Sequence, residues 1–360
     1  MRLITAFAAL SAAIIGTGFW TTTAPAATSA RPIGVGGTIW ITDRQNDRIA
    51  VYDTATATLL GTFSTEGTPD PLHADEPNDV AVAAGKAYVT NEASGTISVF
   101  DASTRALLTR LSAGPKPHHA SASQSEDLVA YGVYGTNQIG IIDTASGSIR
   151  RLTASNRSGT VLTHAPSFSP NGRTVFAANE LRSGTTQLAG SVSAIDLATG
   201  KIKCELTVGV RPSEVVVTPD GRIGYASVRN EHLIKEIDFG SCRLTGRTVD
   251  IGEEVDTLDL SPNGRSLSVG LRGPAPKPAR VAVVDLVSFR AQDVRYWTIP
   301  GGTLTGHQWT SPNRRYTYAA FEGTAPGVAV IDHLRNVVQT LPTIGSGRPH
   351  GIAFEPADDD

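Results

Sequence analysis

The sequence predicts an all-β fold, a seven-bladed β-propeller with four-stranded blades, and three observations carry this prediction. A pair made of Ile or Val and an Asp four residues later recurs seven times along the chain. Short apolar runs alternate with turn residues, a pattern that favours strands joined by hairpins. Glycine (36 residues) and proline (21 residues) are both frequent, and helices tolerate neither well.

The repeated pair sets the number of blades. Its seven copies are Ile49/Asp53, Ile97/Asp101, Ile139/Asp143, Val192/Asp196, Ile234/Asp238, Val281/Asp285 and Val328/Asp332. Successive Asp residues are 48, 42, 53, 42, 47 and 47 residues apart, a period typical of propeller blades. The Asp ends a strand and can accept hydrogen bonds from the amides of the next turn, so we interpret these seven residues as turn makers rather than catalytic groups.

Each copy divides into four strands. In the second copy we expect them at Pro77–Gly85, Ala87–Asn91, Thr96–Phe100 and Ala106–Ser112. The turn between the first two strands is written Ser-Pro-Asn-Gly-Arg or Thr-Pro-Asp-Gly-Arg in three copies, at residues 169–173, 218–222 and 261–265. Proline presets φ in such a turn and glycine takes the positive φ. The copy at Ser311–Arg315 has Arg314 in place of that glycine and must bear strain there.

The two ends of the chain predict export and ring closure. Arg2, the apolar run Leu3–Trp20 and the small residues Ala24–Ala26 indicate a cleavable signal peptide at residues 1–26. We therefore expect a secreted or periplasmic protein with no membrane insertion after cleavage. We expect a flexible segment at 27–37, the propeller at 38–356 and an acidic tail at 357–360. The propeller begins at a second strand (Thr38–Thr42) and finishes with a lone first strand (Gly351–Phe354), which should complete the first blade.

The repeat resembles the YVTN family of bacterial β-propeller proteins. Its naming motif stands here as Tyr88-Val89-Thr90-Asn91, and the same frame recurs at Trp40–Asp43 and more loosely at Phe176–Asn179. The resemblance covers the whole mature chain and implies the propeller fold. It implies no single activity, because the family's relatives include lactonase-like proteins, amine dehydrogenase heavy chains, the propeller domain of nitrous oxide reductase and surface-layer proteins.

Candidate functional residues are those at which the copies differ near the start of the first strand, which lines the central channel. The position that opens this strand holds Asn78, His118, His164, Ser213, Asp256, Gly306 and His350, and the next position holds His119, Glu214 and His307. We expect the histidines to converge at the channel mouth. The candidates for catalysis are His118, His164, His307, His350, Asp256 and Glu214. The candidates for ligand binding are His119, Arg211, Arg348, Asn78 and Trp309.

Three interpretations of the histidines stay open. His118, His164 and His350 could bind a divalent metal such as zinc, copper or iron. The imidazoles could instead act as acid and base, or bind an anionic ligand. They could also be structural, bonding channel water and backbone amides. No His-x-His or Cys-x-x-Cys spacing decides in favour of a metal, so no cofactor is assigned.

The loops favour the same face as a binding surface. Long connections at Ser64–Glu76, Glu180–Ser191 and Arg272–Ala279 fall on the side of the channel mouth, whereas we expect tight turns on the opposite face. His232 and His333 lie outside this set and are expected to be ordinary surface residues. Cys204 and Cys242 could pair in an oxidising compartment or stay as separate thiols.

Composition and motifs exclude several function classes. The chain carries 31 basic and 34 acidic residues with no basic run, so nucleic acid is not an expected partner. It lacks the Gly-x-Ser-x-Gly, Walker and dinucleotide motifs of serine hydrolases and nucleotide enzymes. The leading hypothesis is a monomeric exported propeller that binds a small molecule, glycan or protein. The alternatives are a metal-assisted or histidine-based hydrolase or lyase, and a redox-partner subunit.

Overall fold

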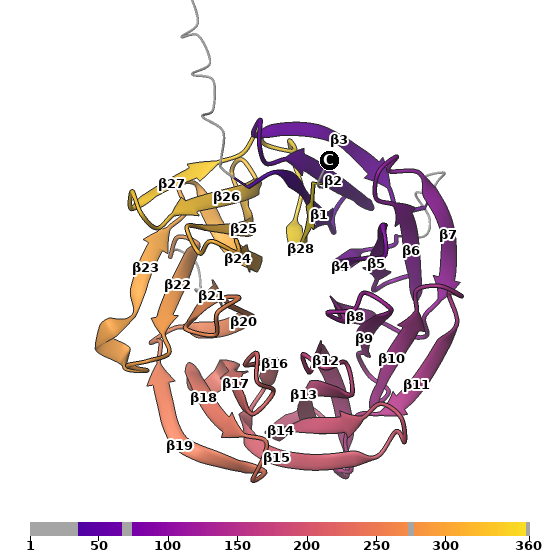
Figure 1. Cartoon of the computed structure of the whole chain (residues 1–360), viewed down its shortest axis with the longest axis vertical. Coiled ribbons are helices and arrows are strands. Elements are labelled where there is room, and N and C mark those ends of the chain that lie inside the picture. Colours follow the sequence, from indigo (N-terminus) through magenta and orange to yellow (C-terminus); the bar gives the residue numbers. More distant parts are fainter. Residues whose placement is uncertain (1–34, 67–73, 273–276, 358–360) are drawn as a thin grey trace, which may run out of the picture. The chain divides into compact units, whose positions relative to one another are not determined.

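The computed structural model describes residues 35–66, 74–272 and 277–357, and this part of the chain forms a ring of seven four-stranded antiparallel sheets (Figure 1). The predicted seven-bladed β-propeller is confirmed. We name the blades A to G in chain order. From the inner to the outer strand they are A (β28-β1-β2-β3), B (β4 to β7), C (β8 to β11), D (β12 to β15), E (β16 to β19), F (β20 to β23) and G (β24 to β27).

The strand bounds follow the predicted repeat closely. They are β1 Gly37–Asp43, β2 Arg48–Asp53, β3 Thr58–Ser64, β4 Pro77–Ala83, β5 Lys86–Asn91, β6 Thr96–Asp101, β7 Leu107–Ser112, β8 Pro117–Ala122, β9 Leu128–Val133, β10 Gln138–Asp143, β11 Ile149–Thr153, β12 Thr160–Phe168, β13 Thr174–Ser183, β14 Thr186–Asp196, β15 Ile202–Val210, β16 Pro212–Val217, β17 Ile223–Val228, β18 Leu233–Asp238, β19 Arg243–Asp250, β20 Glu254–Leu260, β21 Ser266–Arg272, β22 Arg280–Asp285, β23 Arg295–Thr298, β24 Gly302–Thr310, β25 Tyr316–Gly323, β26 Gly327–Asp332, β27 Val337–Thr340 and β28 Pro349–Pro356. Two short 3₁₀ helices, η1 (Arg229–Glu231) and η2 (Ala291–Asp293), lie in connections.

The ring is closed by the last strand of the chain. β28 pairs antiparallel with β1, with Trp40 opposite Ala353 and Ile41 opposite Ile352. Blade A therefore takes its inner strand from the C-terminal end and its other three strands from the N-terminal end. This pairing covers the edge that β1 would otherwise expose.

The core lies between neighbouring blades. Buried Ile39 and Tyr52 of blade A pack in one cluster with Tyr318 and Val330 of blade G. On its other side blade A contributes Trp40 to a cluster with Val80 and Phe100 of blade B. Both faces of each blade are therefore covered, which explains why strands such as β2 and β5 are buried along nearly their whole length.

The anchor Asp residues make turns as predicted. Oδ1 of Asp101 accepts hydrogen bonds from the backbone amides of Ser103 and Thr104 at 3.1 and 2.7 Å. Asp143 and Asp196 do the same for the amides of Ser146 and Thr199, both at 2.8 Å.

Three features differ from the sequence-based expectation. The Glu180–Ser191 insertion is not a loop but an extension of β13 and β14, which stay paired out to Ser183 and Thr186. The opposite face is not uniformly tight, because nine residues, Leu286–Val294, connect β22 to β23, against four or five in the other blades. His333 is half-buried rather than an ordinary surface residue, since its Nε2 lies 2.8 Å from the hydroxyl of Thr317 and its ring packs on Trp297.

The two cysteines, whose pairing the sequence left open, form a disulfide with Cα atoms 5.7 Å apart. Cys204 lies on β15 of blade D and Cys242 in the turn before β19 of blade E, so the bond links neighbouring blades. The predicted signal peptide, most of the 27–37 segment and most of the acidic tail lie outside the described residues, as do residues 67–73 and 273–276 of two predicted long loops. Within the described residues there is no helix with the length and apolar character needed to span a bilayer.

Candidate functional site: a histidine cluster at the hub

Every inner strand is irregular at the same level. The register to the second strand shifts between Pro117 and Ala120 in blade C and between Thr163 and Pro166 in blade D. Equivalent shifts occur in the other five blades. A β-bulge removes a residue from regular pairing and re-aims its side chain. The predicted hub positions fall at or beside these bulges, which is how their side chains leave the sheets and meet at the ring axis.

Five histidines from four blades converge there. They are His118 and His119 of β8, His164 of β12, His307 of β24 and His350 of β28. The ring centroid of His119 lies 4.5 Å from those of His118 and His164, 4.1 Å from that of His307 and 5.6 Å from that of His350. All five are at most 9% exposed. The predicted convergence is confirmed, and His119 is its centre.

The cluster contains two overlapping triads that could hold a metal ion. One nitrogen from each of His118, His119 and His164 lies within 4.8 Å of the others, and the same holds for His119, His307 and His350. The Nε2 atoms of His119 and His307 are 3.2 Å apart. No exposed acidic group belongs to either triad.

Neighbouring groups orient two of the rings. Nδ1 of His350 lies 3.1 Å from the carbonyl oxygen of Asn78, which can only accept, so this nitrogen carries the proton and Nε2 keeps its lone pair. A carboxylate oxygen of Asp79 lies 3.8 Å from Nδ1 of His307, leaving its Nε2 directed at His119. An outer partner on the second ring nitrogen is the arrangement that fixes metal-binding histidines in proteins.

The first triad has fewer partners. The Nδ1 atoms of His118, His119 and His164 are buried and make no hydrogen bond within the described residues. The ring of His118 stacks on Tyr134 at 5.0 Å, and its Nε2 lies 4.0 Å from a carboxylate oxygen of Glu92. Buried polar atoms normally find a partner, so these nitrogens are available to a ligand or to water.

Burial keeps the imidazoles of His118, His119, His164 and His350 neutral. It lowers the pKa of His164 to about 3, helped by the positive charge of Arg229. Burial and the neighbouring histidines hold the pKa values of His118, His119 and His350 well below the ordinary value. At neutral pH these rings therefore offer lone pairs rather than positive charge.

Carboxyl groups around the cluster behave in two ways. Burial raises the pKa of Asp79 and raises that of Glu214 well above its usual range. Burial also acts to raise the pKa of Asp256, but the guanidiniums of Arg229 and Arg272 outweigh it and hold this pKa below its ordinary value. Asp256 is thus a permanent buried anion clamped between two arginines.

The predicted candidates outside the histidines occupy different places. Asp256 reaches the cluster through Arg272, whose Nη2 lies 3.5 Å from Nε2 of His350. Glu214 accepts a hydrogen bond from the amide of Leu258. Among the described interactions neither carboxylate touches a histidine directly.

The remaining predicted ligand contacts are distributed around this centre. The backbone carbonyl of Asn78 accepts from His350, and its side-chain Nδ2 donates to Glu92 at 3.0 Å. Arg211 lies 3.7 Å from Glu254 in the ion-pair network that also contains Arg229. The last two candidates, Arg348 and Trp309, contact other residues. Arg348 pairs with Glu322 at 3.2 Å, and Trp309 stacks on Phe354 at 4.1 Å.

The sequence analysis missed three neighbours of the histidines, namely Asp79, Glu92 and Tyr134. Asp79 follows Asn78 at the position that identified His119, Glu214 and His307, so the same rule could have found it. Glu92 and Tyr134 follow second strands, where the first-strand rule gives no signal.

The inner strands β24, β28 and β4 can approach so closely because of glycine. A Cβ atom on Gly306 would lie 2.4 Å from the carbonyl oxygen of His350, and one on Gly351 would lie 2.3 Å from Oδ1 of Asp79. A side chain at Gly306 would push β24, which carries His307, away from β28, which carries His350, and one at Gly351 would push β28 away from β4.

Comparisons with known proteins define the fold and go no further. The chain matches no family model, and no curated protein matches its sequence. Among solved structures, hydrazine synthase of Kuenenia stuttgartiensis is similar with a TM-score of 0.67 and 19% identity, covering 87% of this chain and 94% of that one. The dihydro-heme d1 dehydrogenase NirN, in complex with DHE, is similar with a TM-score of 0.62 and 12% identity, covering 90% and 77%. Both likenesses support the propeller architecture.

Proposed function

We propose that this protein is an exported β-propeller that binds a transition-metal ion through the histidine cluster at its hub. The observation that carries the proposal is the pair of histidine triads that share His119. Imidazole nitrogens suit zinc, copper, iron and nickel, and a metal needs them neutral. The lowered pKa values of His118, His119, His164 and His350 meet that requirement at neutral pH.

The spacing in the second triad supports the same proposal. Two ligands of a tetrahedral zinc ion with bonds of about 2.0–2.1 Å are separated by about 3.3 Å. The Nε2 atoms of His119 and His307 are 3.2 Å apart. Asp79 and the carbonyl group of Asn78 would act as outer partners of His307 and His350. Arg272 Nη2 faces Nε2 of His350 at 3.5 Å as a donor, so a metal ion bound to this nitrogen would displace that contact. The charge of Arg272 is paired with Asp256 and opposes a bound cation less than a free guanidinium would.

Family and location are further parts of this proposal. The motif Tyr88–Asn91 and its repeats favour a place among YVTN propellers. The disulfide between Cys204 and Cys242 favours an oxidising compartment, as the signal-like segment at residues 1–26 does. A mature chain that begins near Ala27 is expected by mass spectrometry.

The test is a metal titration of protein first freed of metal with a chelator. We expect saturable binding of Co²⁺, followed by its absorption bands, and displacement by Zn²⁺. His119→Gln withdraws a ligand from both triads and should weaken binding by at least about 100-fold. His232→Asn is the matched control, because His232 is exposed and lies in a left-handed conformation that Asn tolerates.

Two results would overturn the proposal. One is the absence of saturable metal binding by the wild-type protein. The other is equal affinity in His119→Gln and wild type when both fold to the same extent by circular dichroism.

A further inference from the structure

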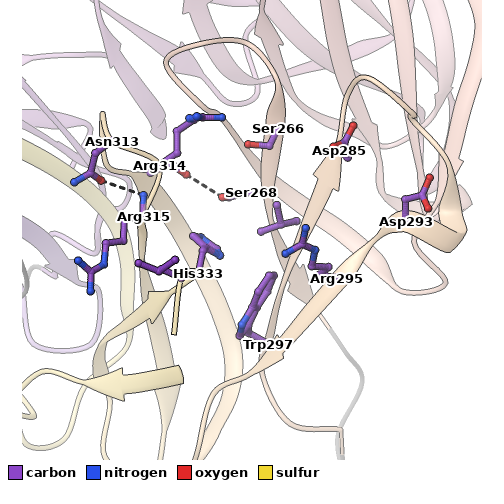
Figure 2. Close-up of a pocket in the computed structure, with 13 residues that line it drawn as sticks. Ser266, Ser268, Asp285, Asp293, Arg295, Trp297, Asn313, Arg314, Arg315 and His333 are labelled. Atoms are coloured by element: carbon purple, nitrogen blue, oxygen red, sulfur yellow. Dashed lines mark hydrogen bonds between the residues drawn. The ribbon is translucent and has the colours of Figure 1, made fainter. Parts of the chain in front are cut away.

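A pocket lies between blades F and G, near the turns at the far ends of the inner strands. Figure 2 shows its lining, which includes Ser266, Trp297, Asn313, Arg314 and His333. Its volume is about 550 Å³, within the range of small-molecule sites. Asn313 follows His307 by six residues along the chain, so the pocket lies up to about 20 Å from the histidine cluster.

Two departures from the repeat border this one pocket. The long β22–β23 connection supplies Asp293 and leads into Arg295. Arg314 has a φ of 57° in the turn where three other blades have glycine. A non-glycine residue in this conformation is strained, and strained residues concentrate at functional sites. The pocket is thus where two departures from the repeat come together on this face.

The charged groups of the pocket include two guanidiniums that have no carboxylate partner in the part of the chain that the structure describes. Arg315 is paired with Asp332 at 3.0 Å, and Oδ1 of Asp285 accepts hydrogen bonds from two turn amides. Within the described residues the guanidiniums of Arg295 and Arg314 make no hydrogen bond or ion pair, and neither does the carboxylate of Asp293. Among the described residues, Arg295 and Arg314 are thus the two unpaired guanidiniums of the pocket, and the carboxylates of Asp285 and Asp293 lie in the same lining.

The uncharged groups add donors and an apolar wall. Oδ1 of Asn313 accepts from the hydroxyl of Ser311 and the amide of Arg315, which leaves its NH₂ group available to donate. Trp297 is held in place by a 3.0 Å hydrogen bond from Nε1 to Asn336 and by the edge of His333, with ring centroids 4.9 Å apart. Burial and the nearby Arg295 lower the pKa of His333, so its ring is neutral.

From these observations we infer that the pocket between blades F and G binds a small anion, a carboxylate or phosphate attached to an apolar ring. The anionic group would meet the guanidiniums of Arg295 and Arg314, and the ring would lie against Trp297 and His333. Carboxylate and phosphate are the groups that guanidinium binds best, because its N–H groups match their oxygens in pairs.

Calorimetric titration with benzoate and with phenyl phosphate tests this inference, and benzamide serves as the neutral isostere of benzoate. We expect saturable binding of at least one anion and about tenfold weaker binding of benzamide. The stronger of the two anions identifies the preferred group. Quenching of Trp297 fluorescence, absent in Trp297→Phe, would locate the bound ligand.

The decisive variant is Arg314→Gly, which restores the residue used by three other blades. It removes a guanidinium and relieves the positive φ, so affinity for the anion should fall about tenfold while the melting temperature stays the same or rises. Arg173→Gln changes an exposed arginine after the equivalent turn of blade D and should leave both unchanged. The inference is overturned if neither anion binds saturably, if benzamide binds as well as benzoate, or if Arg314→Gly retains full affinity.

Discussion

The turns after the third strands and the bulges of the inner strands occur seven times each, but only the turns are alike. Each turn uses an Asp whose carboxylate accepts hydrogen bonds from nearby amides, as in Asp101 and Asp143. The bulges instead hold histidine, aspartate, asparagine, serine or glycine in different blades. The positions that agree build the blade, and the positions that differ carry the candidate chemistry.

The pKa values of titratable groups are shifted by different causes in the turns and at the hub. Hydrogen bonds from Thr104 and Ser103 lower the pKa of exposed Asp101 to about 2. At the hub, burial is the first cause of the pKa shifts of His119, His164, Asp79 and Glu214. Water and nearby amides stabilise a charged carboxylate at the turns. At the hub a buried group stays ionised only where an opposite charge faces it.

The largest expected consequence is acid sensitivity that originates at the hub. The pKa of His164 is about 3 in the folded protein and about 6.5 when unfolded, so the unfolded chain binds more protons between these values. Stability should therefore fall as the pH drops from about 6.5 to about 3, by up to about 5 kcal/mol for His164 alone. Asp79 and Glu214 act in the opposite sense, because their raised pKa values favour the folded state at low pH.

This pH dependence can be measured by urea unfolding of chelator-treated protein across that range. His164→Gln cannot take up the proton and should flatten the slope, while His232→Asn should retain it. A wild-type slope that appears only below about pH 4 would assign acid unfolding to carboxylates and not to the hub.

A smaller effect is expected from Asp256→Ala. Asp256 is 1% exposed and pairs with Arg229 and Arg272. Its removal leaves buried guanidinium charge without this partner, which typically costs about 3–5 kcal/mol. Arg229 keeps its 2.8 Å ion pair with Glu254, so we expect the lower end of that range in denaturant unfolding. Asp220→Ala, in an exposed turn, should change stability far less, and equal losses in the two variants would contradict a special role for the hub pair.

The repeat makes the fold predictable from sequence because it rests on local chemistry. The Ile/Val-to-Asp pairs, the Pro-Asn-Gly turns and the strand phases of the two ends each follow from neighbouring residues. The convergence of His118, His164 and His350 could be predicted because they hold the same position when the repeat copies are aligned.

The finer parts of the site depend on contacts between distant segments and gave no local signal. The lone pair on Nε2 of His350 is set by the carbonyl of Asn78, 272 residues away in the chain. The pairing that turned Glu180–Ser191 into an extended hairpin was equally invisible, since an insertion can lengthen two strands as readily as it can form a loop. The pocket between blades F and G is bordered by both the long β22–β23 connection of blade F and the turn of blade G that contains Arg314. Comparing the copies one at a time does not reveal that these two segments border the same pocket.

The smallest effect is expected at the repeated turns, from Asp143→Ala. The variant loses the 2.8 Å hydrogen bonds from the amide and hydroxyl of Ser146 to Oδ1, but water can replace an exposed partner. We therefore expect a loss of about 1 kcal/mol or less by urea unfolding, with metal binding unchanged. Asp143→Asn keeps an oxygen acceptor and should recover much of the loss. If Asp143→Ala instead weakened metal binding, the division between turns that build the blade and bulges that carry the chemistry would fail, because this carboxylate belongs to neither histidine triad.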